Sequence, residues 1–305
     1  FRVRQYNDRS KLSFHRVPAV FCDGTLHKYI RLNRMDVFRN RISQYASLRD
    51  DAWSKFDQID FQTRAFQSGD DIIRVGETPA KMFIVKEGWA IRHRSLDDGR
   101  RQIVNFMLPG DVFDMQVIAG VKADHSVTAI TRTVVATVAA DQFMNVLRSD
   151  ADVAAAFWWA AVQEESILRE QIVRVGRRSA KERIAHLLLE LQRRLRAAVG
   201  GAEDHLPMPL TRTDLADALG LTPVHVSRTM SALRRSGLID ESRGQVTILD
   251  RRRMESLSQF DTDYLHVRKL DFVARANLNG SSHSPLSNGA ISSHTNHHRI
   301  PRNDN

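Results

Sequence analysis

The sequence predicts an α+β fold in which an antiparallel β structure is followed by a long helix and a winged helix-turn-helix. First, glycines spaced 7 to 12 residues apart separate short β-branched and aromatic segments between residues 65 and 140. Second, a stretch that starts near residue 150 carries apolar residues three and four apart and contains no proline. Third, residues 211–249 contain two short helical patterns joined at a glycine and followed by two strand-like segments. Such periodicities are the primary local signals of helix and strand.

Length, composition and cysteine content limit the class of protein. The chain has 305 residues, of which 42% are hydrophobic and 27% charged, values typical of a folded protein with about two domains. No apolar run of roughly 18 residues predicts a membrane span, and no apolar core follows the basic first residues as in a secretory signal. The single cysteine, Cys22, excludes an intramolecular disulfide, a cysteine-rich zinc site and a four-cysteine iron–sulfur cluster. These features predict a cytoplasmic protein with no membrane partner.

The formal net charge of +9 is unevenly distributed along the chain. Residues 1–34 hold 8 basic and 2 acidic residues, whereas residues 35–176 hold 17 basic and 20 acidic ones. Residues 177–253 again have an excess of basic residues, 15 against 9, and residues 254–305 have 5 of each. A basic module is typical of a nucleic-acid binder, because phosphate neutralisation supplies most of the sequence-independent affinity. A merely solvated basic surface has the same composition, so charge alone leaves both interpretations open.

The two ends of the chain differ in pattern from the part between them. We interpret residues 1–34, which precede the first methionine (Met35), as a non-native or disordered extension. We interpret residues 254–305 as a tail that is disordered from about residue 277, because it is rich in Ser, Asn, His and Gly. Its last histidines could chelate a metal, although a solvated tail is the simpler interpretation.

Residues 35–149 have the pattern of a small antiparallel barrel or sandwich. The segments rich in β-branched and aromatic residues are 82–85, 90–93, 103–107 and 134–138. Asp98-Gly99 is a hairpin signal, and Pro109-Gly110-Asp111 marks a second turn. The glycine spacing suits turns between short strands, because glycine adopts positive φ without steric cost.

We expect a long helix over residues 150–176, capped by Asp150 or Asp152. Its apolar residues are Val153, Ala156, Phe157, Ala160, Ala161, Ile167, Leu168 and Ile172. This is more apolar surface than one small barrel covers, so the pattern predicts a dimerisation helix. Glu164 and Gln171 interrupt a regular heptad, and a helix packed wholly within its own subunit is the alternative.

The basic module, residues 177–253, begins with a second amphipathic helix. We expect this helix over residues 179–198, where leucines recur on one face. Residues 199–209 contain two glycines and two prolines, which indicate a loop or hairpin.

Residues 211–249 have the pattern of a winged helix-turn-helix. Thr211 or Thr213 can cap a short first helix that ends at Gly220. Thr222-Pro223 opens the second helix, with a cap residue followed by proline at the first helical position. The two wing strands are expected at 238–241 and 246–249.

Such a module suits double-stranded DNA, because its second helix fits the major groove and presents the side chains of its N-terminal half to base edges. If Val226 is buried, four residues of that half are exposed, and we assign base reading to Val224, His225, Ser227 and Arg228. Phosphate contacts fix register without reading sequence, and we assign them to Thr211, Arg212, Thr222 and Arg243. A small helical module for protein contacts is the alternative.

The motif LTPVHVSR at residues 221–228, followed by Gly-Leu-Ile at 237–239, is the most specific sequence signal. Further motifs lie at 99–103, 109–111, 176–186 and 210–220. On these residues the chain from 35 to 253 resembles the Crp/Fnr family of transcription regulators. The resemblance implies a homodimer without enzymatic activity, whose β-roll resembles cyclic-nucleotide-binding domains and senses a small-molecule effector. It also implies a dimerisation helix over 150–176, a winged helix on two-fold symmetric DNA, and contact with RNA polymerase.

The effector site departs from the pattern of the family's cyclic-nucleotide binders. Asp114 and Met115 stand where those proteins have Gly-Glu, and His125-Ser126 replaces their phosphate-holding Arg-Ser pair. An acidic residue without the arginine would repel a cyclic phosphate, which argues against cAMP binding. Asp114, Met115, His125 and Ser126 therefore remain candidates for an unassigned effector.

We predict no cofactor for this chain. The family's iron–sulfur oxygen sensors need a cysteine cluster, which Cys22 alone does not supply. Haem-binding relatives use a histidine, and the sensory domain has only His93 and His125, which we interpret as surface or turn residues. Haem is not excluded by the sequence.

The second helix also departs from the family, because Val224 replaces its usual glutamate. A carboxylate accepts from cytosine, whereas valine contacts only a thymine methyl, so we expect altered half-site bases beside one guanine read by Arg228. Two other functions remain as alternatives. One is a cyclic-nucleotide-binding regulatory protein, and the other is a cupin-like metal-dependent enzyme, which would need more β-region ligands than His93 and His125.

Overall fold

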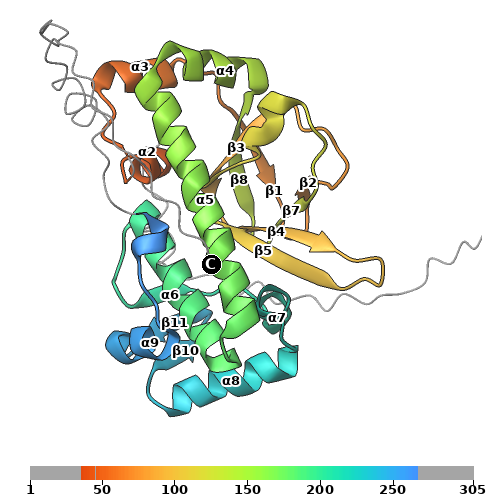
Figure 1. Cartoon of the computed structure of the whole chain (residues 1–305), viewed down its shortest axis with the longest axis vertical. Helices are drawn as coiled ribbons and strands as arrows, with labels where there is room; N and C mark the ends of the chain where they lie inside the picture. Colours follow the sequence, from red (N-terminus) through yellow and green to blue (C-terminus); the bar gives the residue numbers. More distant parts are fainter. Residues whose placement is uncertain (1–35, 45, 267–305) are drawn as a thin grey trace, which may run out of the picture. The chain divides into compact units, whose positions relative to one another are not determined.

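The computed structural model describes residues 36–44 and 46–266, which form a β-roll, a long helix and a winged helix in that order. Figure 1 shows the long helix, α5 (Ala151–Arg177), passing beside the sheets and reaching the C-terminal helices. This architecture confirms the α+β fold class expected from the sequence. The extension predicted over 1–34 and the disordered tail predicted from about 277 lie outside the described residues.

Two four-stranded antiparallel sheets form the β-roll. The first contains, in spatial order, β1 (Gln62–Phe66), β8 (Thr133–Ala139), β3 (Lys81–Glu87) and β6 (Val112–Phe113). The second contains β2 (Asp71–Ile73), β7 (Ser126–Ala129), β4 (Ala90–Ser95) and β5 (Arg101–Met107). Val85 pairs with Val135 in the first sheet, and both are buried with Val127 of the second in one hydrophobic cluster. The four segments predicted as strands are therefore strands of this roll.

Two glycines of the β-roll lie where a side chain does not fit. Gly88 has a φ of +82°, and a Cβ atom there would lie 2.3 Å from the carbonyl oxygen of Arg132. Gly110 has a φ of +88°, and its Cβ would lie 2.9 Å from the carbonyl oxygen of Val37 in α2 (Asp36–Ile42). The predicted turn at Pro109-Gly110-Asp111 therefore lies directly against α2.

Asp150, one of the two predicted cap residues, begins α5. Its Oδ1 accepts hydrogen bonds from the backbone N–H groups of Asp152 (3.0 Å) and Val153 (3.3 Å). Burial raises the pKa of Asp150, but hydrogen bonds from Lys55 and the two backbone groups outweigh burial and hold this pKa below its usual value. Phe157 of α5 packs nearby against aromatic rings of α2, α3 (Asp50–Asp57) and α4 (Ala140–Ser149).

The winged helix follows α5 and contains helices on a three-stranded sheet. Its helices are α6 (Ala180–Val199), α7 (Arg212–Leu219), α8 (Pro223–Arg235) and α9 (Arg251–Ser258). Its sheet has the order β10 (Ile239–Ser242), β11 (Gln245–Ile248), β9 (His205–Pro207). Strand β9 lies within the segment 199–209, which the sequence predicts as a loop or hairpin. Its buried residue Leu206 pairs with Val246 of the wing, so β9 forms the third strand of this sheet.

Helix α9 crosses the boundary predicted between residues 253 and 254, so that boundary is wrong. Met254 and Ser258 of α9 are buried, and the helix packs on α6. The chain continues as the C-terminal strap (residues 260–266). Gln163 of α5 donates a hydrogen bond to the carbonyl oxygen of Leu265 in this strap. Ser166 of α5 also lies 2.8 Å from Nε2 of His266. The helices within residues 36–44 and 46–266 are each too short or too polar to span a bilayer.

Candidate nucleic-acid interface

Both helices of the helix-turn-helix begin at the residues that the sequence predicts. The Thr211 hydroxyl accepts a hydrogen bond from the backbone N–H of Asp214 (3.1 Å), and the backbone N–H of Thr211 donates to the Asp214 carboxylate (3.0 Å), which completes a capping box. Gly220 ends α7 in the left-handed region, with a φ of +62°. The Thr222 hydroxyl then accepts from the backbone N–H of His225 (3.2 Å), with Pro223 at the first helical position of α8.

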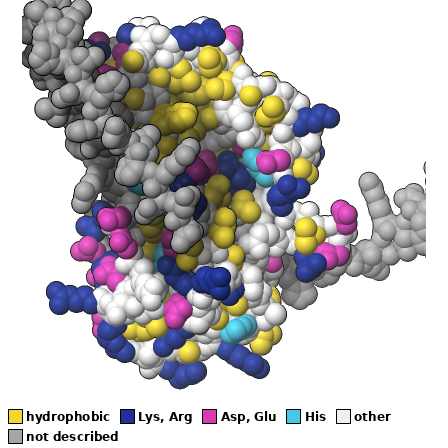
Figure 2. All heavy atoms as spheres, viewed as in Figure 1, with side chains coloured by type: hydrophobic (Ala, Val, Ile, Leu, Met, Phe, Trp, Pro, Cys, Tyr) yellow, Lys and Arg dark blue, Asp and Glu magenta, His cyan; other side chains and the backbone are white. Residues whose placement is uncertain are grey.

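The N-terminal half of α8 presents its predicted base-reading residues to solvent. Val226, Met230 and Leu233 of α8 are buried in the winged-helix core. This orientation leaves exposed the side chains of Val224, His225, Ser227 and Arg228. The structure therefore brings all four together on one face, and their contacts with bases remain a prediction. Figure 2 shows Lys and Arg side chains gathered at the lower end of the molecule, where Figure 1 places α8.

The four predicted phosphate-binding residues differ in whether their side chains already make hydrogen bonds within the protein. The hydroxyls of Thr211 and Thr222 already cap their helices. Arg212 donates from Nη2 to both carboxylate oxygens of Glu241 on β10 at 2.6 Å. This pair ties α7 to the wing and competes with a phosphate for the guanidinium. Arg243 is exposed in the turn between the wing strands, with a φ of +49°.

Helix α5 divides the apolar residues of its sequence pattern between two environments. Val153, Ala156, Phe157 and Ile167 are buried within the chain, as the alternative of internal packing requires. Ile172 is 69% exposed, and Trp158, which lies outside the predicted apolar set, is 73% exposed. Figure 2 shows hydrophobic side chains on the face crossed by α5. Internal packing therefore accounts for only part of the pattern.

The candidate effector residues Asp114 and His125 contact each other. His125 Nε2 lies 3.3 Å from Asp114 Oδ1, and His125 Nδ1 lies 2.7 Å from Asp124 Oδ1. Burial lowers the pKa of His125, but the hydrogen bonds with the two carboxylates outweigh burial and raise this pKa above its usual value. Met115 is half-buried, and the Ser126 hydroxyl accepts from the backbone N–H of Val75 (3.0 Å).

The two sensory-domain histidines, which the sequence predicts as surface or turn residues, are not exposed. His125 lies in a bend before β7 but is buried, and His93 is a half-buried residue of β4. His93 Nε2 lies 2.9 Å from the hydroxyl of Thr128 on β7. Burial lowers the pKa of His93. The predicted strand over 90–93 is present, but His93 is not a surface residue because its side chain contacts Thr128 of the neighbouring strand.

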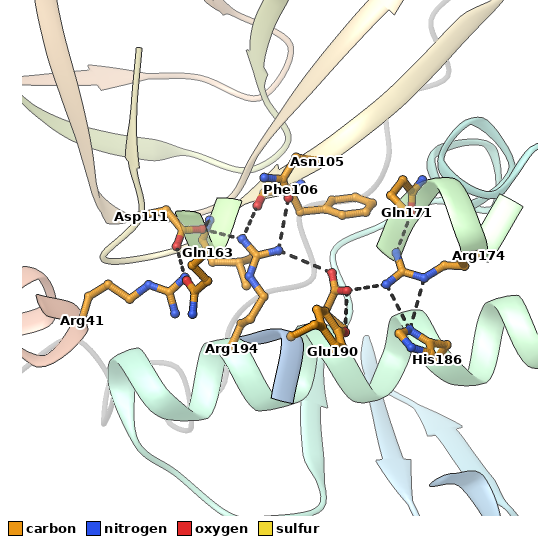
Figure 3. A network of polar contacts seen from close by, with 12 residues as sticks. Arg41, Asn105, Phe106, Asp111, Gln163, Gln171, Arg174, His186, Glu190 and Arg194 are labelled. Carbon is orange, nitrogen blue, oxygen red and sulfur yellow. Dashed lines mark hydrogen bonds and ion pairs between the residues drawn. The ribbon is translucent and has the colours of Figure 1, made fainter. Parts of the chain in front are cut away.

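A buried charge network lies where the β-roll, α5 and α6 meet (Figure 3). In this network, Arg41 of α2 and Arg194 of α6 contact Asp111 of the β5–β6 turn at 3.0 and 2.8 Å. Arg194 also contacts Glu190 at 3.6 Å, and Glu190 pairs with Arg174 of α5. Each of these five side chains is less than 10% exposed. The sequence pattern does not predict the network, because its contacts join α2, the β5–β6 turn, α5 and α6.

His186 of α6 extends this network as a neutral group. Its Nδ1 accepts from Arg174 at 3.0 Å, and its Nε2 lies 3.2 Å from Glu170. Burial, and then the charges of Arg174 and Arg178, lower the pKa of His186 to about 2. Tyr264 of the C-terminal strap stacks on this imidazole and donates to Glu190 at 2.8 Å.

Two family models match the chain and leave the long helix between them. A cyclic nucleotide-binding domain matches residues 63–150, and a Crp-like helix-turn-helix domain matches residues 182–257. The first match covers the β-roll and α4, and the second covers the winged helix including most of α9.

Several bacterial regulators are similar to this chain. The nitrogen fixation regulation protein FixK of Bradyrhizobium diazoefficiens is 36% identical over 193 residues, which are 63% of this chain and 80% of that protein. The transcriptional activator protein FnrL of Cereibacter sphaeroides is 33% identical over 208 residues, 66% of this chain and 82% of that protein. The solved structure of FixK2 from Bradyrhizobium japonicum matches with a TM-score of 0.59 at 28% identity, covering 66% of this chain and 98% of that one.

Proposed function

Since the chain belongs to the Crp/Fnr family of DNA-binding transcriptional regulators, which are not enzymes, we propose that it binds a two-fold symmetric promoter site as a homodimer. The observation that carries this proposal is the exposed N-terminal half of α8. That half is capped by Thr222 and backed by the buried side chains of Val226 and Met230. A helix presented in this way enters the major groove with its first turns against base edges.

The dimer is proposed from the apolar residues that α5 leaves uncovered. Trp158 and Ile172 lie 14 residues apart, which is two heptads, and both are largely exposed. The equivalent face of a second copy would cover such a stripe, and the charge of Glu165 between them is paired with Arg169 on the same helix. A seam along α5 places the two recognition helices on opposite sides of one two-fold axis, as a palindromic site requires.

The half-site bases follow from the side chains that α8 exposes. Arg228 reads a guanine through two hydrogen bonds, and Val224 contacts the methyl group of a thymine. Arg243 in the wing contacts a phosphate, together with Thr211, Thr222 and Arg212 once it leaves Glu241. Promoter-bound dimers of this kind act through RNA polymerase in the cytoplasm.

The sensory part of the proposal concerns the pair of Asp114 and His125. A small-molecule effector that binds near Asp114, Met115, His125 and Ser126 has to displace or bridge this buried pair. An anion such as a cyclic phosphate meets the carboxylate of Asp114, so the effector is expected to be neutral or cationic. The proposal includes no resident cofactor, and a haem titration followed by Soret absorbance would contradict this if it saturated at one haem per chain.

Selection of bound duplexes from random DNA by the full chain tests the proposal. We expect an inverted repeat whose half-sites are about one helical turn apart and contain the guanine read by Arg228. Sedimentation of the protein alone should give a dimer. Recovery of asymmetric sites, or a monomer that binds them, would contradict the homodimer. Repeating the selection with cell metabolites then identifies an effector through a change in recovery.

A further inference from the structure

The first helix of the helix-turn-helix, α7, is held by side chains from outside the winged helix. Arg101 at the start of β5 donates from Nη2 to Asp214 Oδ1 (2.8 Å) and from Nε to Asp217 Oδ2 (2.9 Å). Gln102, the next residue of β5, donates to the carbonyl oxygen of Ala218 at 3.2 Å. The β-roll therefore contacts both an acidic face and the C-terminal end of α7.

Helices α5 and α6 hold the same end of α7. Gln171 of α5 donates from Nε2 to the carbonyl oxygen of Ala218 (2.5 Å), while its Oε1 accepts from Arg174 of the buried network (Figure 3). Arg183 of α6 donates to the carbonyl oxygen of Leu219 (2.8 Å). Since the last carbonyl groups of a helix lack partners within it, these donors satisfy them and fix the end of α7.

Helix α8 follows the position of α7 because the two share one core. Leu215 and Leu219 of α7 and Val226 of α8 belong to a single buried cluster, which also contains Ile103 of β5. A shift of α7 relative to α5 would therefore carry the exposed face of α8 with it.

We propose that Arg101 is a positioning residue that fixes the distance between the two recognition helices of the dimer; the inference rests on the proposed homodimer with α5 at its two-fold axis. A dimer reads two half-sites only if its recognition helices are held about 34–36 Å apart. The planar guanidinium contacts two carboxylates of α7 at once, which restrains rotation as well as translation of that helix. Gln171 provides the matching contact from α5 itself.

Arg100 offers a matched control for Arg101. It is the neighbouring residue, its side chain is 76% exposed, and it pairs with Asp98 within the same hairpin rather than with α7. Arg101→Gln and Arg100→Gln therefore remove the same charge from the same hairpin. Asp217→Asn removes one partner of Arg101 and leaves the capping box of Asp214 intact, and Arg101→Lys keeps the charge without the planar fork.

The test measures the distance between wings in the full-length dimer. Cys22→Ser and Ser242→Cys leave one thiol per subunit for a spin label, and pulsed dipolar spectroscopy gives the intersubunit distance distribution. We expect one narrow distribution for the parent and for Arg100→Gln, and a broad one for Arg101→Gln. Asp217→Asn and Arg101→Lys should fall between these limits.

Affinity for DNA provides the second readout. Arg101→Gln should weaken binding to the full palindrome about 10-fold, as expected for the loss of a hydrogen-bonded charge pair. Binding to a single half-site should stay as in the parent, because it does not depend on the spacing of the two helices. This separates positioning from a general loss of stability.

The outcomes distinguish this inference from the proposed function. A parent that shows no intersubunit distance, or that binds full and half-sites equally, contradicts the homodimer and overturns the inference with it. A parent with one narrow distance, combined with unchanged distributions in both Arg101→Gln and Asp217→Asn, overturns the positioning role alone.

Discussion

Helices α6 and α8 belong to the same winged helix and both contain arginine, but Arg194 of α6 is buried and paired whereas Arg228 of α8 is exposed. Arg194 of α6 is 3% exposed and contacts Asp111, Glu190 and backbone of β5. Arg228 of α8 lies on an exposed face of a helix that contains no acidic residue. The comparison shows that an arginine joins the fold where carboxylates surround it and remains available for a phosphate or base where they do not.

Breaking the buried network gives the largest expected effect. Arg174→Met leaves the Glu190 carboxylate without its closest charge partner, which should lower the free energy of unfolding by about 3–5 kcal/mol. Chemical denaturation measures this loss. Arg169→Met, on the exposed side of the same helix, is the control and should cost less than about 1 kcal/mol. Equal effects of the two variants would show that burial does not distinguish these arginines.

Lowering the pH should destabilise the folded protein through His186 of α6. In the unfolded chain a histidine binds a proton below about pH 6.5, whereas His186 in the fold stays neutral down to about pH 2. Between these values the unfolded state binds more protons, so stability falls as the pH falls, by about 2 kcal/mol from pH 6.5 to pH 5. Urea unfolding at several pH values measures this slope.

His186→Gln keeps a donor and an acceptor but removes the titration, so its slope over this range should be shallower. His125 acts with the opposite sign. Its raised pKa stabilises the fold below about pH 6.5, and this contribution is lost as the pH rises through the folded-state value. An unchanged slope in His186→Gln would contradict the assignment of the neutral form.

Substitution of Arg228 or Arg212 should change DNA binding while changing stability by less than about 1 kcal/mol. Arg228→Ala should cost about 1–3 kcal/mol of discrimination at one base pair. Arg212→Ala should weaken binding to all sequences alike and lower the salt slope by about 1. Fluorescence anisotropy with single-base variants of the selected site, at several salt concentrations, measures both.

Glu241→Gln sharpens this test, because it releases the Arg212 guanidinium and should strengthen binding at low salt. If Arg228→Ala and Arg212→Ala both bind the selected site as the parent does, α8 is not the helix that reads DNA.

The smallest effect is expected at the cap of α8. Thr222→Ala removes the acceptor for the His225 backbone N–H and should cost about 1 kcal/mol of stability. Thr222→Ser retains the hydroxyl and should behave as the parent in thermal unfolding. A loss of DNA affinity in Thr222→Ala that exceeds its loss of stability would support the predicted phosphate contact.

Features set by local chemistry could be predicted from the sequence. Thr211, Gly220 and Thr222-Pro223 define the ends of α7 and α8, because caps and helix termination depend on neighbouring residues alone. The exposure of Val224 and Arg228 followed once Val226 was assigned to the core. Strands β3, β4, β5 and β8 also contain the four segments predicted from local residue types, whereas β1, β2, β6 and β7 were not predicted.

Features set by long-range packing could not be predicted. Strand β9 lies among glycines and prolines and becomes a strand only by pairing with β11. Helix α9 begins with three arginines, and its buried face is defined only by contact with α6. Asp111 lies 83 residues from Arg194, and Asp214 and Asp217 lie 113 and 116 residues from Arg101, so no local pattern connects these pairs. Periodicity assigned α6 an apolar face and gave no reason to place charges on it.

The uncovered face of α5 also provides an optical signal. The chain has 4 tryptophans, of which Trp89 is 5% exposed, Trp53 and Trp159 are half-buried, and Trp158 is 73% exposed. If a second copy covers Trp158, association should shift the intrinsic emission to shorter wavelength as the indole leaves water. Dilution series of the unlabelled protein would then follow subunit exchange directly, with Trp158→Phe as the spectroscopic blank.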